Sequence, residues 1–305
     1  MSAGPRLRRA IELFVRISAF ALVHLPIRAP LPLRLQRGWL QIAALANVVP
    51  RGMRPAADDL GGVPTEVIEG GETGSMLYFH GGGYVLGSPR VERVTPARLA
   101  QASGTTSYAP AYRLAPEHPF PSAFDDALSA YHALLQRTAG GPIVLAGDSA
   151  RGGLALALAV AIRDRGLPPP AGVLLICPWL DLAIDRRSGR DADPVLPRAL
   201  LTRGARLYLD GHEPRDPRCS PLHADLAGLP PILVHAAEED PIRDDAERLA
   251  ARAEESGVEV ELVLYPYWHD FHLHAGLLPA AGEALDQAGG FIRAQLDRPV
   301  EAARG

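Results

Sequence analysis

The chain has 305 residues, enough to bury the core of one large α/β domain or of two smaller domains. Its composition is ordinary for a soluble enzyme, and a net charge of −4, with every one of the 31 basic residues an arginine, argues against a nucleic-acid partner. The two cysteines, Cys177 and Cys219, are too few for a disulfide framework, so we expect a reduced, cytoplasmic protein.

The first 57 residues differ from the rest in charge. They contain nine arginines and one acid, Glu12, so they carry 9 − 1 = +8 and the remainder carries −4 − 8 = −12. Glu12, Arg16 and His24 interrupt the apolar run and Pro26 ends it, which makes a poor transmembrane helix and a poor signal peptide. We expect residues 1–57 to form an N-terminal cap packed on the protein, and contact of this segment with an anionic membrane surface stays open.

The remainder, residues 58–305, alternates apolar runs of strand length with stretches of helical period. The expected strands are 76–79, 105–108, 143–146, 173–177, 232–236 and 258–264, and the expected helices are 93–102, 122–136, 154–165 and 244–255. This alternation predicts a mostly parallel, doubly wound sheet in one catalytic domain. Residues 181–229, rich in Pro, Arg and Asp, break the alternation, and we expect them to form a second piece of the cap.

The run from Gly147 to Arg151 lies between an expected strand and an expected helix. That order is the setting of a nucleophilic serine, because the sharp turn exposes the hydroxyl and the helix N-terminus favours negative charge. Ser149 is therefore the candidate nucleophile. The usual motif is Gly-x-Ser-x-Gly, and Arg151 stands where its second glycine belongs.

A run of three glycines follows the first expected strand directly. Glycines at such a place allow a close approach of the backbone to a ligand. We expect the amides of Gly81 and Gly82, together with that of Ala150, to form an oxyanion hole. His80, which leads the run, is interpreted as a structural residue of the loop.

A serine nucleophile needs a base, and the base needs a carboxylate that orients it. His269 is the first histidine after the last expected strand and is the preferred base, although the sequence does not exclude His272. Asp240 follows the preceding strand and stands before a proline, which holds it extended. The chain order Ser149, Asp240, His269 is that of the α/β-hydrolases.

Several motifs together resemble those of the hormone-sensitive-lipase-like family of α/β-hydrolases, the bacterial family IV esterases, over roughly residues 60–295. The motifs are His80-Gly81-Gly82-Gly83-Tyr84, the run from Tyr112 to Pro121, Gly147-Asp148-Ser149-Ala150, Pro178-Trp179-Leu180-Asp181-Leu182, Ser220-Pro221-Leu222 and Asp240-Pro241-Ile242-Arg243-Asp244.

The resemblance implies an α/β-hydrolase fold with an N-terminal helical cap and a carboxylesterase that uses a small-molecule ester, prefers short- to medium-chain acyl groups, and needs no cofactor or metal. By the same resemblance, we expect the substrate to contact Tyr84, Asp148, Trp179 and Leu180. Both a monomer and a homodimer remain open.

The chain departs from the family pattern at three places: Ala111 replaces a usual aspartate, Asp270 replaces the glycine after the catalytic histidine, and Arg151 replaces the second glycine of the serine motif. The last departure supports an alternative, in which the chain is a catalytically weakened or ligand-binding relative that keeps the fold. It also suggests that Arg151 is a defect.

Overall fold

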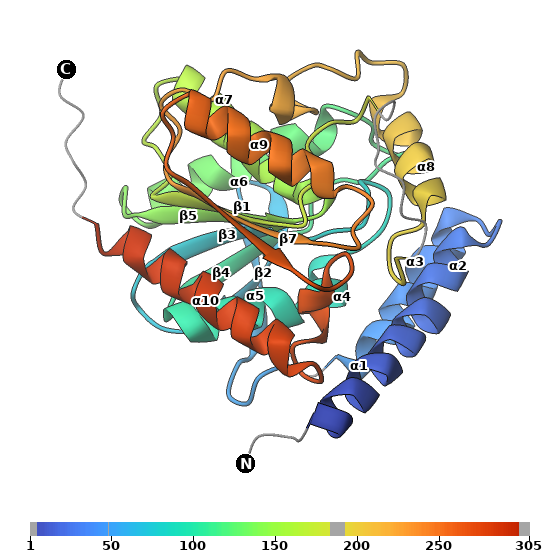
Figure 1. The fold of residues 1–305 in the computed structure, drawn as a ribbon. Helices are drawn as coiled ribbons and strands as arrows, with labels where there is room; N and C mark the ends of the chain where they lie inside the picture. Colours follow the sequence, from blue (N-terminus) through green and yellow to red (C-terminus); the bar gives the residue numbers. More distant parts are fainter. Residues whose placement is uncertain (1–4, 48, 184–192, 299–305) are drawn as a thin grey trace.

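An eight-stranded sheet lies at the centre of the structure, a computed structural model that describes residues 5–47, 49–183 and 193–298 (Figure 1). The strand order is β1-β2-β4-β3-β5-β6-β7-β8. The strands are β1 Pro55–Leu60, β2 Val63–Glu69, β3 Ser75–Phe79, β4 Thr106–Pro110, β5 Ile143–Asp148, β6 Gly172–Ile176, β7 Ile232–Ala237 and β8 Val260–Tyr265. Strands β3 to β8 pair in parallel, whereas β1 and β2 are antiparallel to their neighbours. The predicted mostly parallel sheet is thus confirmed.

The hairpin β1–β2 was not expected from the sequence. Its two-residue turn, Gly61-Gly62, has φ values of +64° and +86°, a backbone that favours glycine in tight hairpins. Strand β1 is exposed at every residue but Leu60, so it lacks the apolar alternation that would identify a strand. Because β1 begins at Pro55, the segment 1–57 includes the start of the sheet.

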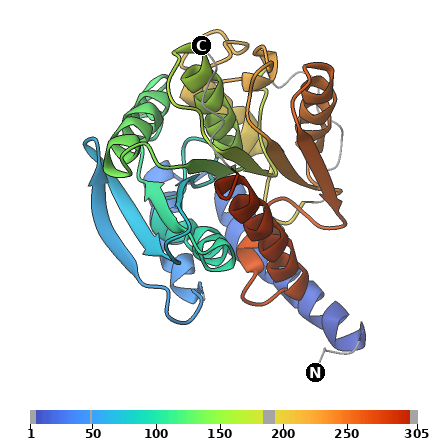
Figure 2. The ribbon, with the colours of Figure 1, turned by 90° about the vertical axis from the view of Figure 1, so that its left-hand side faces the viewer.

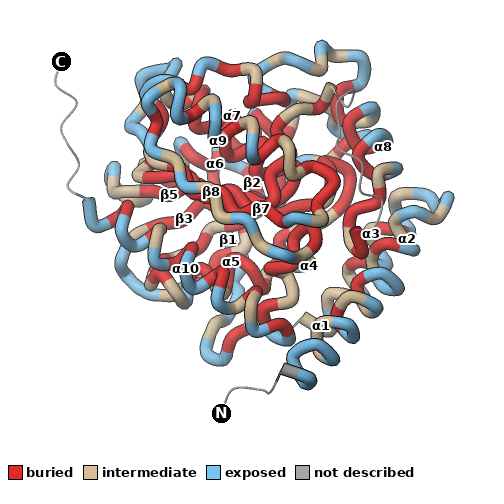
Figure 3. Tube along the Cα trace, viewed as in Figure 1, coloured by how far each residue is buried: buried red, intermediate tan, exposed pale blue. Residues whose placement is uncertain are grey.

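Helices cover both faces of the sheet (Figures 1 and 2). One face carries α6 Ser122–Arg137, α7 Ala150–Asp164 and α9 Arg243–Glu255, and the other carries α5 Val94–Ser103 and α10 Pro279–Leu296. The short helix α4 Pro89–Glu92 and the 3₁₀ turns Pro221–His223 and Phe271–His274 lie in the connections. Each face has its own buried apolar cluster, which explains why strands β3, β5 and β6 are buried at every residue (Figure 3).

The N-terminal helices lie side by side along one flank of the molecule (Figure 1). They are α1 Pro5–Ala19, a π-helical turn Phe20–His24, α2 Leu25–Arg28, α3 Leu33–Ala43 and a 3₁₀ turn Ala44–Ala46, and α8 Arg198–Leu209 contacts α2. Gln36 ties α3 to the preceding segment, since its Nε2 donates to the carbonyls of Pro26, Ile27 and Ala29. The helical stretch Arg6–Arg28 is long and apolar enough to span a membrane by length and composition alone, contrary to the expectation of a poor transmembrane helix, although core helices of soluble proteins and signal sequences meet the same criteria.

Candidate active site

Ser149 occupies a strained turn between β5 and α7. Its backbone has φ +55° and ψ −127°, and its amide donates to Ile176 O at 2.8 Å. The turn is tight enough that a Cβ on Gly147 would lie 2.4 Å from the carbonyl oxygen of Arg151. Glycine is therefore required at 147, and the turn fixes the direction of the serine hydroxyl.

The loops after β7 and β8 bring a carboxylate and an imidazole to this hydroxyl. His269 Nε2 lies 2.9 Å from Ser149 Oγ, and His269 Nδ1 lies 2.8 Å from Asp240 Oδ2. The other carboxylate oxygen of Asp240 accepts the amide of Ile242 at 2.9 Å, which orients the carboxylate. All three side chains are buried, so the arrangement is that of a nucleophile, a base and an orienting acid.

His272, left open by the sequence, lies elsewhere. Its Nε2 is 3.1 Å from Nδ1 of His235 on β7, and both rings are buried. Burial lowers the pKa of His272 well below its usual value, so it stays neutral and packs in the core beside Tyr265 and Phe271.

The expected oxyanion hole needs one correction. The amide of Gly81 donates to Glu92 Oε2 at 2.7 Å, so the proposal of Gly81 as an oxyanion donor was wrong. Gly82 and Gly83 line the pocket together with Ser149, and no hydrogen bond from either amide is found among the described residues. The candidate oxyanion donors are therefore Gly82, Gly83 and Ala150, the first residue of α7.

Gly81 instead makes room for two buried carboxylates. A Cβ at this position would lie 2.2 Å from Asp148 Oδ2 and 2.9 Å from Glu92 Oε2. Burial first, and Asp148 second, raise the pKa of Glu92 well above its usual value, which favours the neutral form of this carboxyl group. Tyr78 completes the group by donating its hydroxyl to Asp148 Oδ1 at 2.7 Å. This network holds the glycine loop against β5.

The four residues expected to contact substrate do not line the pocket. Asp148 belongs to the buried acid network, and Tyr84 stacks on Tyr208 with ring centroids 3.7 Å apart. Trp179 donates its indole N–H to Asp181 O, and the amide of Leu180 donates to the buried Asp245. All four are at most 2% exposed, so these expectations were wrong because the motifs that contain them build the core beneath the site.

The pocket itself has a volume of about 240 Å³, and Ser149 and His269 are among the residues that line it. Its apolar wall comes largely from the segments that break the strand–helix alternation. Val15, Ala19, Leu22 and Leu40 contribute from the N-terminal helices, and Leu196 and Leu200 from the region after β6. Part of the expected second cap piece, residues 184–192, lies outside the described residues.

Arg151, the main departure from the serine motif, is completely buried. Its guanidinium carbon lies 5.3 Å from the ring centroid of Tyr84 and 4.9 Å from that of Tyr112. Nη2 donates to Leu86 O at 3.2 Å, whereas Nε and Nη1 have no hydrogen-bond partner in the described part of the chain. The side chain thus fills the space behind the glycine loop and contacts two aromatic faces.

His80 and Tyr112 complete the support of the loop. Their rings stack with centroids 4.5 Å apart, and the Tyr112 hydroxyl donates to His80 O at 2.7 Å. Burial, and then the charge of Arg151, lower the pKa of His80 well below its usual value. This agrees with the structural role expected of His80.

Asp270 places a second carboxylate beside the imidazole of His269. Its Oδ2 lies 3.1 Å from His269 Nε2, the nitrogen that also faces Ser149. The residue has φ +50°, a conformation that suits the glycine usual in the family. Burial raises the pKa of Asp270 to about 7, and the charge of His269 opposes this rise.

The two carboxylates also act on the imidazole. Burial alone lowers the pKa of His269, but the charges of Asp240 and Asp270 outweigh it and raise the pKa well above its ordinary value. Because the base must be neutral to accept a proton from Ser149, Asp270 disfavours the reactive form at low pH.

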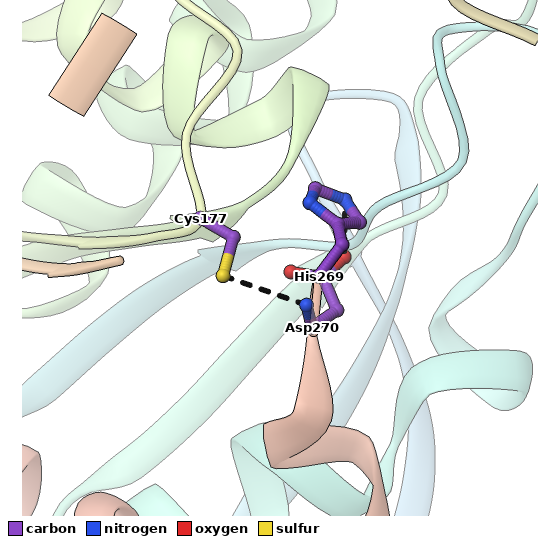
Figure 4. A group of neighbouring side chains, drawn as sticks. All are labelled: Cys177, His269 and Asp270. Atoms are coloured by element: carbon purple, nitrogen blue, oxygen red, sulfur yellow. Dashed lines mark hydrogen bonds and ion pairs between the residues drawn. The ribbon is translucent and has the colours of Figure 1, made fainter. Parts of the chain in front are cut away.

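Among the described residues, Cys177, His269 and Asp270 form a group of potential metal ligands (Figure 4), with one donor atom of each within 4.8 Å of the others. The backbone amide of Asp270 donates to Cys177 Sγ at 3.4 Å, and His269 Nε2 faces Ser149. Burial raises the pKa of the Cys177 thiol well above 9, which disfavours the thiolate that a metal ion prefers. The thiol is thus a hydrogen-bond acceptor that holds the turn after His269.

Asp193 is a contributor that the sequence did not indicate. Its Oδ2 accepts the amide of His269 at 2.6 Å, and its Oδ1 accepts the amides of Val195 and Leu196. It lies in the region after β6, so it links this region to the loop that carries the base. An aspartate before a proline in a polar segment gave no sequence signal of this contact.

Comparisons with known proteins agree with this geometry. Residues 76–273 match a family described as having the alpha/beta hydrolase fold. The chain is 42% identical over 224 residues to an acetyl-hydrolase of Streptomyces hygroscopicus, covering 72% of this chain and 75% of that protein. It is 33% identical over 276 residues to an esterase of Acinetobacter venetianus, covering 82% and 91%.

A crystal structure of a hormone-sensitive lipase from a metagenome library is similar along nearly the whole chain. The TM-score is 0.88 at 35% sequence identity, and the match covers 95% of this chain and 98% of the other.

Proposed function

The chain belongs to the hormone-sensitive-lipase-like family of α/β-hydrolases and is a carboxylic ester hydrolase, and we propose that it cleaves short- to medium-chain acyl esters through an acyl-enzyme on Ser149. The observation that carries the proposal is the hydrogen-bonded series of Ser149 Oγ, His269 and Asp240, whose serine and imidazole line a mostly apolar pocket.

In the acylation step, Ser149 Oγ attacks the ester carbonyl carbon while His269 Nε2 takes the hydroxyl proton. The carbonyl oxygen becomes an oxyanion and accepts the amides of Gly82, Gly83 and Ala150. Asp240 stabilises the imidazolium through Nδ1–H. The imidazolium then gives its Nε2 proton to the leaving alkoxide, the C–O bond breaks, and the alcohol departs.

Deacylation repeats these steps with water as nucleophile. His269 Nε2 takes a proton from the water, whose oxygen attacks the acyl carbon, and the second oxyanion uses the same three amides. Collapse of this intermediate breaks the bond to Ser149 Oγ, which recovers its proton from the imidazolium. The products are the carboxylic acid and free enzyme, and no oxidant or cofactor enters the balance.

The preference for short and medium acyl chains is supported by the size and lining of the pocket. A volume of about 240 Å³ holds a short aliphatic chain, and the walls from Val15, Ala19, Leu22 and Leu40 are apolar.

The alternative, a catalytically weakened or ligand-binding relative, rested on Arg151 alone. Arg151 packs behind the glycine loop and leaves Ser149 and His269 in hydrogen-bond contact, so this alternative is not supported.

The experiment is a rate profile with p-nitrophenyl acetate, butyrate and decanoate for the wild type and three variants. We expect Ser149→Ala and His269→Ala to reduce kcat by about 10⁴-fold or more, since members of a triad act as a unit. His272→Ala is the control, because that ring contacts His235 and not Ser149. Loss of activity in His272→Ala with retention in His269→Ala would overturn the assignment of the base.

A further inference from the structure

The outer face of the N-terminal helices is unusually apolar. Of the fourteen large hydrophobic side chains that are exposed in the described part of the chain, twelve lie between residues 7 and 45. That segment is 39 of 305 residues, so the exposed apolar area is concentrated in one place rather than scattered, as it is on ordinary surfaces.

Nine of these twelve side chains form two stripes at helical spacing. We call them the cap face, which consists of Leu7, Leu13, Phe14, Ile17 and Phe20 on the first helical stretch and Leu35, Trp39, Ile42 and Leu45 on and after α3. Val15 and Ala19 lie on the opposite side of α1, where they are buried and line the pocket. Figure 3 shows the exposed side of α1 turned away from the protein. One helix thus separates the substrate pocket from the cap face.

The charged side chains around the cap face are almost all positive. Residues 1–57 carry nine arginines and one acid, and among these arginines Arg16 is half-buried and pairs with Glu239, and Arg37 is half-buried and pairs with Glu117. The other seven are exposed: Arg6, Arg8, Arg9, Arg28, Arg34, Arg51 and Arg54. Arginines flanking an exposed apolar stripe complement a surface that is apolar within and anionic at its edge.

We propose that the cap face docks on an anionic lipid bilayer, with the helices lying flat in the headgroup region. A dimer formed through this face would bring the basic surfaces of two copies against each other, and their repulsion disfavours it. A membrane-spanning position would separate α1 from the protein, break the ion pair of Arg16 with Glu239 at 2.6 Å and remove Val15 and Ala19 from the pocket wall. The tryptophan of the face, Trp39, is a residue type enriched at membrane interfaces.

This inference rests on the proposed esterase activity. Docking in this way also specifies the class of substrate that the esterase takes. The helices that touch the bilayer are those whose inner sides line the pocket. The enzyme then hydrolyses esters that have partitioned into the lipid. Its rate at the bilayer, relative to its rate on the same ester in solution, increases with the apolar character of the substrate.

The test is co-sedimentation of the full-length protein with vesicles of phosphatidylcholine alone and of equal parts of phosphatidylcholine and phosphatidylglycerol. We expect binding to the mixed vesicles only, with release when NaCl rises from about 0.1 to about 0.5 M. In Arg28→Gln/Arg34→Gln, each lost arginine lowers the partition coefficient about fivefold. Arg165→Gln, an exposed arginine far along the chain, is the matched control and keeps wild-type binding.

The apolar part is tested with Leu13→Gln/Phe14→Gln/Ile17→Gln, since none of these residues lines the pocket. We expect at least about a tenfold loss of vesicle binding with unchanged hydrolysis of p-nitrophenyl acetate, which shows that the fold is kept. Leu264→Gln, at an exposed leucine on β8, is the control. Binding measured in Ser149→Ala separates this inference from the proposed function, because that variant binds vesicles whether or not Ser149 is the nucleophile.

Four outcomes overturn the inference, and three of them concern the vesicles: no binding to anionic vesicles, equal binding of the triple variant, and binding that resists high salt and alkaline carbonate, which indicates a spanning helix. A wild type that is dimeric in solution and becomes monomeric in the triple variant assigns the cap face to a second copy instead.

Discussion

At the scale of single residues, Asp270 distinguishes this site from one with glycine after the histidine. Its carboxylate lies 3.1 Å from the imidazole nitrogen that must accept the serine proton. The charges that face His269 come from several elements: Asp240 after β7, Asp193 after β6, and Asp270 itself. Asp148 of β5 acts on Asp270, and burial favours the neutral form of the neighbouring Glu92 of α4. Asp240 is required to orient the ring, whereas Asp270 only stabilises the protonated form.

Replacing Asp270 is therefore expected to move the pH profile. In Asp270→Asn and Asp270→Gly, the pKa of His269 falls, so the neutral base is present at lower pH and the acid limb of kcat/KM shifts down by about one pH unit. The measurement is the profile with p-nitrophenyl acetate between about pH 5 and about pH 9. An acid limb that stays in place, or moves up, would show that Asp270 does not act on the base.

Arg151 is the second informative residue, and the structure reverses the expectation drawn from the sequence. The guanidinium contacts Tyr84 and Tyr112 and fills the space that a glycine would leave empty. We expect Arg151→Gly to lower the stability by about 2–5 kcal/mol, as large-to-small core changes do, and the Tm by about 5 °C or more.

A matched variant separates volume from charge. Arg151→Met keeps most of the volume and removes a buried charge, so its Tm stays close to that of the wild type. Thermal unfolding of the two variants provides the comparison. A higher Tm for Arg151→Gly would restore the interpretation of Arg151 as a defect.

At the scale of elements, the N-terminal helices shape the substrate site from one side. Ala19 of α1 is 3% exposed and lines the pocket, whereas Ala21, two residues on, is exposed and does not. The helix therefore offers two neighbouring positions at which the same substitution has different consequences.

Ala19→Phe is expected to shorten the pocket. Hydrolysis of p-nitrophenyl decanoate should fall about tenfold or more relative to the acetate, because each methylene that loses its apolar contacts reduces binding in the transition state. The measurement is the ratio of kcat/KM for the two esters, with Ala21→Phe as the control. An unchanged ratio in Ala19→Phe would mean that the acyl chain lies elsewhere.

The strands and loops show which parts of the fold and of the site could be predicted from the sequence. Strands β3 to β8 were predicted because buried parallel strands are continuous apolar runs, and the rule that functional loops follow such strands led to Ser149, Asp240 and His269. Strand β1 was missed because its side chains are mostly exposed. Which glycine amide faces the oxyanion depends on Glu92 of α4 reaching Gly81, a contact that no local pattern encodes.

At the scale of the whole molecule, the expected substrate contacts failed for a related reason. Tyr84, Trp179 and Leu180 belong to strong motifs, but a motif does not tell whether its residues line the pocket or support it from below. In the folded chain they are buried behind the site, and the pocket wall comes from segments without a motif, such as α1 and the region around Leu196. The catalytic centre was thus predictable from chain order, whereas its specificity surface depends on tertiary packing.

The central claim, that Ser149 is the nucleophile of a covalent mechanism, is tested most directly with diethyl p-nitrophenyl phosphate. This reagent phosphorylates an activated serine and releases p-nitrophenol, and the phosphoryl-enzyme does not turn over readily. We predict one equivalent of p-nitrophenol for each chain, one diethylphosphoryl group on the peptide that contains Ser149, and parallel loss of ester hydrolysis. Labelling of another residue, or ester hydrolysis that persists after Ser149 is fully modified, would contradict the account.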